Sequence, residues 1–129
     1  QQWSAANNIE VKLDIDPELG RLPEAIKLSV YRIVQEGLSN VRKHARASQV
    51  RIALSRTPTA SLMMKLIDNG QGLPGKLDLA SLSQRKSFGL VGIGERVSLL
   101  RGTMDISRSE GGGLEMTIEI PSPYPSITN

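Results

Sequence analysis

One long amphipathic helix constrains the fold of this chain more than any other feature. It is expected from about Pro23 to Ala45, with Pro23 in the first turn, where a missing backbone N–H costs little. At about 100° of rotation per residue, a single apolar stripe follows this segment. The stripe consists of Ile26, Val30, Ile33, Val34 and Val41. Such a stripe must be buried, so the helix is expected to cover a second layer of structure.

A second, polar stripe lies roughly a quarter-turn or more away on the same helix. It contains Arg32, Glu36, Asn40 and Lys43. A carboxylate, an amide and an ammonium on one wall could together hold a metal ion and a phosphate. A solvated surface has the same spacing and is the commoner outcome, so both interpretations stay open at this point.

The remaining segments are mostly strand-like. Alternating residues predict a half-buried strand over Ile9–Ile15, and a second helix is expected from about Leu90 to Arg101, ended by Gly102. Two hairpins are expected, with strands at Val50–Leu54 and Leu62–Ile67, and at Thr103–Arg108 and Leu114–Ile120. Paired strands with few helices favour an α+β two-layer sandwich over a doubly wound parallel sheet.

Composition excludes several classes of function. The chain has no cysteine, which rules out a disulfide scaffold and thiolate metal sites, and its single histidine, His44, rules out multi-histidine metal sites. Four aromatic residues are too few for base-stacking platforms, so no nucleic-acid partner is expected. The 129 residues suit one domain, and no apolar run approaches the roughly 18 residues of a membrane span. Because the chain starts at Gln1 without a methionine, it is expected to be a piece of a longer protein.

A glycine-rich segment, DNGQGLPG from Asp68 to Gly75, fits two phosphate-binding fingerprints loosely. The dinucleotide fingerprint needs a helix directly after its glycines, and Pro74 followed by Gly75 is a poor helix start. The P-loop needs a Ser or Thr after its lysine, where this chain has Leu77. A plain turn with glycines at positive φ is a third interpretation.

A fourth interpretation uses Asp68 itself, since a carboxylate at a strand end can accept a hydrogen bond from the exocyclic amine of a purine. Phosphates would then need other partners. Asn40 and Lys43 are candidates, as is a second glycine cluster over residues 88–94, because the bare N–H groups at a helix start favour anions. The three stretches together predict one nucleotide site that none of them forms alone.

Three motifs carry a resemblance to a known family. They are Glu36-x-x-x-Asn40-x-x-Lys43-His44, Asp68-x-Gly70-x-Gly72 and Gly89-Leu90-x-Gly92-x-x-Glu95-Arg96. In this order they resemble the GHKL ATP-binding family of gyrases, heat-shock chaperones, histidine kinases and mismatch-repair ATPases. The stretches VRKHARAS and GLVGIGERVSLLRG are similar, more narrowly, to the catalytic domain of sensor histidine kinases of the nitrate-sensor type.

The resemblance implies a fold and a division of the chain. The fold would be of the Bergerat type, with a mixed, mostly antiparallel sheet covered on one face by helices. Residues 1–8 would be a leader, 9–121 the ATP-binding catalytic domain and 122–129 a flexible tail.

The resemblance also implies roles for single residues, with ATP and Mg²⁺ as cofactors. Asn40 would coordinate magnesium, Asp68 would bind the adenine amino group, and Glu36 would act as a general base or orient the accepting histidine. The implied ATP-binding residues are Asn40, Lys43, Asp68, Gly70, Gly72, Gly89, Leu90 and Gly92. Residues 73–88 would form a lid over the nucleotide.

The implied activity is phosphoryl transfer from ATP to a histidine on separate dimerisation helices, and onward to a response-regulator receiver domain. The location would be the cytoplasmic part of a membrane-bound bacterial sensor. Two features depart from the expected pattern: Leu114 replaces a usual threonine, and no phosphoacceptor helix is present. A serine kinase acting on an anti-sigma-factor antagonist and a non-catalytic interaction module are the alternatives.

Overall fold

The computed structural model describes residues 9–42, 47–70, 90–110, 112–121 and 123. The elements are β1 (Glu10–Ile15), α2 (Glu24–Asn40), β2 (Gln49–Arg56), β3 (Leu62–Asp68), α4 (Leu90–Leu99), β4 (Thr103–Arg108) and β5 (Leu114–Ile120). Several predictions fall outside the described residues, namely the leader, the lid, most of the tail, and the roles of Lys43, Gly72 and Gly89.

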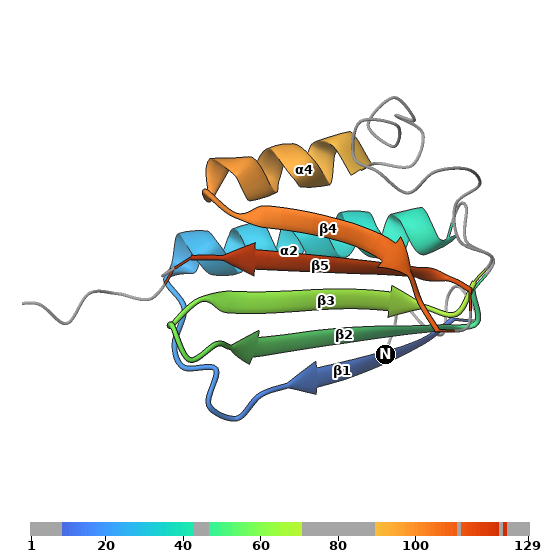
Figure 1. Ribbon diagram of the computed structural model, residues 1–129, viewed down its shortest axis with the longest axis horizontal. Coiled ribbons are helices and arrows are strands. Elements are labelled where there is room, and N and C mark those ends of the chain that lie inside the picture. Colours follow the sequence, from blue (N-terminus) through green and yellow to red (C-terminus); the bar gives the residue numbers. More distant parts are fainter. Residues whose placement is uncertain (1–8, 43–46, 71–89, 111, 122, 124–129) are drawn as a thin grey trace, which may run out of the picture.

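The strands form a single five-stranded sheet in the order β1-β2-β3-β5-β4 (Figure 1). β1 runs parallel to β2, and every other neighbouring pair is antiparallel. The two predicted hairpins are therefore confirmed, and the second has the predicted strand bounds. The prediction of a mixed, mostly antiparallel sheet with helices packed on it is confirmed as well.

The core lies between the sheet and the two helices. β3 and β5 each bury every second side chain, as a strand with one covered face must. From α2, the predicted apolar stripe faces this layer: Val30, Ile33 and Val41 are buried, and Ile26 and Val34 are partly buried. The fully buried side chains of the core include Ile33, Ile52, Leu62, Met64, Ile93, Val97, Met116 and Ile118.

α2 packs tightly on the sheet at Gly37, where a Cβ atom would overlap the Leu66 side chain. Gly37→Ala is therefore expected to destabilise the fold by about 1–3 kcal/mol through overpacking, despite the higher helix propensity of alanine. Gly94→Ala in α4 is the control, since its methyl group would only touch Met104 Cε at 3.6 Å. Urea unfolding measures both variants. Equal stability of the two would contradict the close packing of α2 on β3.

The burial predicted for β1 is wrong beyond its first residues. Leu13 and Ile15 are 54% and 53% exposed, although they pair in register with Ile52 and Leu54 of the neighbouring strand. The reason is position: β1 is the edge strand, at the far side of the sheet from α4 and β4 (Figure 1). Alternation predicted the strand correctly, but it could not say whether a helix would reach over it.

The end of α4 also differs from the prediction. The helix stops at Leu99, and the residue with a left-handed backbone is Arg101, with φ 59°, instead of Gly102. The Gly102 N–H donates to the Val97 carbonyl at 2.9 Å and closes the helix. Glycine is needed at 102 for a different reason: a Cβ atom there would lie 2.7 Å from the Glu119 carbonyl oxygen of β5.

Candidate functional site

Asn40 is the last residue of α2 and is buried, with 5% of its surface exposed. At the end of the helix, the Val41 N–H donates to the carbonyls of Gly37 and Leu38, which closes the last turn. Within the described part of the chain, the Asn40 side-chain oxygen Oδ1 has no hydrogen-bond partner. A buried acceptor left unpaired costs about 1–3 kcal/mol, and amide oxygens are among the ligands that Mg²⁺ accepts. The unpaired amide oxygen of Asn40 is therefore suited to bind a magnesium ion that accompanies a phosphate.

Asp68 is the last residue of β3 and continues the buried side of that strand after Leu62, Met64 and Leu66. Only 4% of its surface is exposed. Burial raises the pKa of Asp68, while hydrogen bonds from the backbone N–H groups of Gly70 (2.8 Å) and Leu114 (3.3 Å) act in the opposite direction on that pKa. Among the described residues, both of these hydrogen bonds fall on Oδ1, so the second carboxylate oxygen could accept from a ligand.

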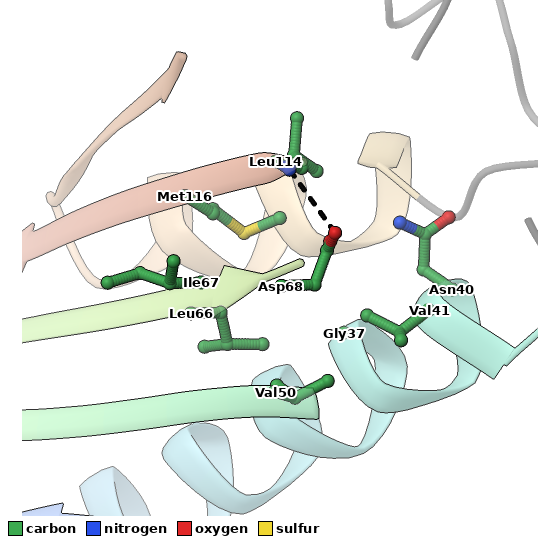
Figure 2. A pocket seen from close by; sticks show the side chains of 9 residues that line it. All are labelled: Gly37, Asn40, Val41, Val50, Leu66, Ile67, Asp68, Leu114 and Met116. Carbon is green, nitrogen blue, oxygen red and sulfur yellow. Dashed lines mark hydrogen bonds between the residues drawn. The ribbon is translucent and has the colours of Figure 1, made fainter. Parts of the chain in front are cut away.

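A partly open pocket joins these two side chains (Figure 2). The cavity volume is about 10 Å³, room for about one water molecule. Its lining is Gly37, Asn40, Val41, Val50, Leu66, Ile67, Asp68, Leu114 and Met116. Apart from one amide and one carboxylate, these side chains are apolar. The pocket therefore brings two buried polar groups, the Asn40 amide and the Asp68 carboxylate, together in an apolar lining.

The turn between β4 and β5 holds Asp68 in place. The Ser109 hydroxyl donates to the Asp68 backbone carbonyl at 2.9 Å, and the Ser109 N–H donates to the Gly113 carbonyl at 2.7 Å. Gly112 completes the turn with φ 95°, which favours glycine. Gly113 packs so tightly on Asp68 that a Cβ atom would overlap its carbonyl. Ser109 and Gly113 were not predicted from the sequence, where their only signal is their place in the predicted hairpin turn.

Leu114 makes its contact with Asp68 through the backbone. The register places it opposite the carboxylate, and its N–H, which any residue other than proline offers, donates to Oδ1. The departure from threonine at this position therefore leaves this one hydrogen bond intact.

Ser109→Ala is expected to destabilise the fold by about 1 kcal/mol, because the Asp68 carbonyl loses a buried donor. Ser107→Ala is the matched control, since Ser107 lies two residues earlier, near the end of β4, and is exposed. Chemical denaturation of both variants is the measurement. A Ser109→Ala variant as stable as the control would show that the hydroxyl does not support the site.

Glu36 lies one helical turn before Asn40 and joins α2 to α4. Its Oε1 accepts a hydrogen bond and ion pair from Arg96 Nε at 2.9 Å. Its Oε2 faces Gly92, where a Cβ atom would lie 2.7 Å away. Arg32, from the same predicted polar stripe, is exposed instead. Within this stripe, Glu36 and Asn40 therefore belong to the candidate site, whereas Arg32 lies on the solvated surface.

The predicted site residues fall into three groups. Asn40 and Asp68 line one pocket, with the Gly70 N–H bonded to Asp68. The Glu36 carboxylate lies close to Gly92 of α4, with no room for a Cβ atom between them. Leu90 begins α4, and the remaining predicted ATP contacts lie outside the described residues. Among the residues that the structure describes, no group of three or more His, Asp or Glu side chains could hold a metal, so Asn40 is the one candidate ligand predicted there.

Comparisons with known proteins agree with this geometry. Residues 25–124 match the family described as histidine kinase-, DNA gyrase B- and HSP90-like ATPase. A curated relative is the signal transduction histidine-protein kinase/phosphatase DegS of Brevibacillus brevis, 37% identical over 101 residues. That match covers 78% of this chain and 25% of the relative, so the chain spans about a quarter of DegS.

Two solved structures share the fold. The blue-light activated histidine kinase EL346 of Erythrobacter litoralis superposes with a TM-score of 0.77 at 23% identity, covering 95% of this chain and 39% of that one. The ATP binding domain of PrrB from Mycobacterium tuberculosis superposes with a TM-score of 0.73 at 21% identity, covering 95% and 88%. With the family match over most of its length, the chain belongs to the histidine kinase-, DNA gyrase B- and HSP90-like ATPase family.

Proposed function

We propose that this chain binds ATP together with Mg²⁺ in the pocket between α2 and the end of β3. The observation that carries the proposal is the pairing of two buried polar groups in one apolar pocket: the unpartnered Asn40 oxygen and the Asp68 carboxylate. Asp68 would accept from the adenine amine, and Asn40 would hold magnesium near the phosphates. When bound, magnesium supplies charge neutralisation of the phosphates.

We propose further that the chain is the catalytic domain of a sensor histidine kinase. The 37% identity to the DegS kinase/phosphatase supports this assignment. The γ-phosphoryl group would pass to a histidine on separate dimerisation helices and then to a response-regulator receiver domain. Glu36, beside the pocket, would accept a proton from the attacking imidazole or orient it. Phosphoryl transfer of this kind depends mainly on positioning and on neutralised charge.

The other predicted roles belong to the same proposal. Lys43, Gly70, Gly72, Gly89, Leu90 and Gly92 would contact or shape the space for ATP, within a catalytic domain spanning residues 9–121. The nitrate-sensor subfamily also stays a prediction. In the described ranges no helix is both long and apolar enough to cross a membrane. The cytoplasmic portion of a bacterial sensor remains the proposed location.

Transfer of radiolabelled phosphate from ATP to an isolated histidine-bearing dimerisation bundle tests this proposal. The expected product is an acid-labile, alkali-stable phosphohistidine on the bundle, formed only when the chain, ATP and magnesium are all present. Labelled serine on a supplied anti-sigma-factor antagonist would favour the serine kinase instead. Binding of nucleotide without any transfer would favour the interaction module.

A further inference from the structure

The ion pair between Glu36 and Arg96 joins the two helices of the domain. The two residues are 60 positions apart in sequence, one on α2 and the other on α4, with side chains 32% and 41% exposed. The contact is a single one, from Arg96 Nε to Glu36 Oε1 at 2.9 Å. It therefore restrains one carboxylate oxygen without using the other.

The second carboxylate oxygen is restrained by shape. Oε2 lies over the backbone of α4 at Gly92, at a position 2.7 Å from where a Cβ atom would be. Any larger residue at 92 would push the carboxylate aside, since the end of a glutamate side chain moves easily. Gly94, two residues on, has no such neighbour, because its added Cβ atom would only touch Met104 at 3.6 Å. The first part of α4 thus forms a seat for the Glu36 carboxylate.

We infer that Arg96 is a positioning residue for Glu36 and that Gly92 provides the room its carboxylate needs; this inference rests on the proposed kinase function. In the reaction, one imidazole nitrogen forms the new N–P bond while the bond from the γ-phosphorus to the β–γ bridging oxygen breaks. ADP leaves with that electron pair. The proton on the other imidazole nitrogen is accepted by Glu36 Oε2, the oxygen that Arg96 leaves unused.

Removal of Arg96 distinguishes a positioning role of the ion pair from a purely structural one. Partly exposed ion pairs contribute little to stability, so removal of Arg96 should leave the fold intact. A misplaced base, by contrast, lowers the rate of the chemical step without changing the affinity for nucleotide. The expected signature is a loss of transfer rate at an unchanged dissociation constant for ATP.

The experiment compares Gly92→Ala, Gly94→Ala, Arg96→Gln and Arg96→Lys in the full chain. Each variant is titrated with a non-hydrolysable ATP analogue and magnesium, and then assayed for phosphoryl transfer to the histidine-bearing bundle at saturating ATP. The NMR signal of the Arg96 Nε–H in the wild type and in Gly92→Ala reports the ion pair directly.

Arg96→Gln is expected to keep nucleotide affinity within about twofold and to lose about tenfold or more in transfer rate. Gly92→Ala is expected to lose transfer rate as well. Arg96→Lys should recover part of that rate, Gly94→Ala should match the wild type, and Gly92→Ala should shift the Nε–H signal. A wild-type rate in both Gly92→Ala and Arg96→Gln, or an equal loss of affinity and rate in Arg96→Gln, would overturn the inference. A wild-type chain that binds ATP but transfers nothing would instead show that the proposed kinase function fails, and the inference with it.

Discussion

Asn40→Ala is expected to lower the affinity for magnesium–ATP by about 100-fold or more. A lost cation ligand near the phosphates removes several kcal/mol of electrostatic stabilisation, and each 1.4 kcal/mol is a factor of ten in affinity. Because Asn40 is 5% exposed and supplies one of only two buried polar groups in the pocket lining, no neighbouring described residue of that lining can replace its oxygen. Calorimetric titration with magnesium present measures the loss.

The same substitution is not expected to destabilise the free protein. Since Asn40 Oδ1 has no partner among the described residues, its removal breaks no hydrogen bond to that atom. Ser39→Ala, one residue earlier on α2, controls for the change in helix propensity. Unchanged affinity of Asn40→Ala would contradict the assigned role. A large loss of stability would mean that the lower affinity results from unfolding of the variant.

Asp68→Asn is expected to reduce the preference for ATP over GTP by about 100-fold, since the contact at residue 68 becomes unfavourable with adenine and favourable with guanine. The amide oxygen of asparagine can still accept from the Gly70 and Leu114 N–H groups. Its NH₂ group would then face the adenine amine, donor against donor, but would suit the carbonyl of guanine. Titrations with both nucleotides test this, with Asp105→Asn on the exposed part of β4 as control. Equal losses for ATP and GTP would contradict base recognition by Asp68.

The free Asp68→Asn variant is expected to be at least as stable as the wild type at neutral pH. Burial raises the pKa of Asp68, so the folded protein holds this proton more tightly than the unfolded chain. The stability that Asp68 contributes is therefore highest at low pH and decreases as the pH rises from about 3.8 through the raised pKa. As the pH is lowered through this range, the wild type regains the stability that protonated Asp68 contributes. The difference in unfolding free energy between Asp68→Asn and the wild type should therefore become smaller.

The parts of the fold that follow a strong period could be predicted from the sequence. The apolar stripe of α2 and the strict alternation of β5 are long enough to determine element type and covered face. The burial of β1 could not be predicted, because Leu13 and Ile15 have the same alternation as a covered strand and differ only in their distance from the helices. Local pattern identifies a strand, while its burial depends on where the helices end.

The site was predictable where a residue type is chemically unusual for its position. Asp68 occupies a position where the alternation of β3 calls for an apolar side chain, and Asn40 follows the buried stripe of α2. Arg96, Ser109 and the carboxylate contact of Gly92 act on other site residues through tertiary contacts. Sequence spacing carries no information about which partner such a residue will meet across 40 to 60 positions.

Calorimetric titration of the wild-type chain with a non-hydrolysable ATP analogue, with and without magnesium, tests the central claim most directly. The account predicts saturable binding, micromolar or weaker, that requires magnesium and is lost in Asn40→Ala. Absence of binding at millimolar nucleotide, in a chain shown by its unfolding transition to be folded, would contradict a nucleotide site between Asn40 and Asp68.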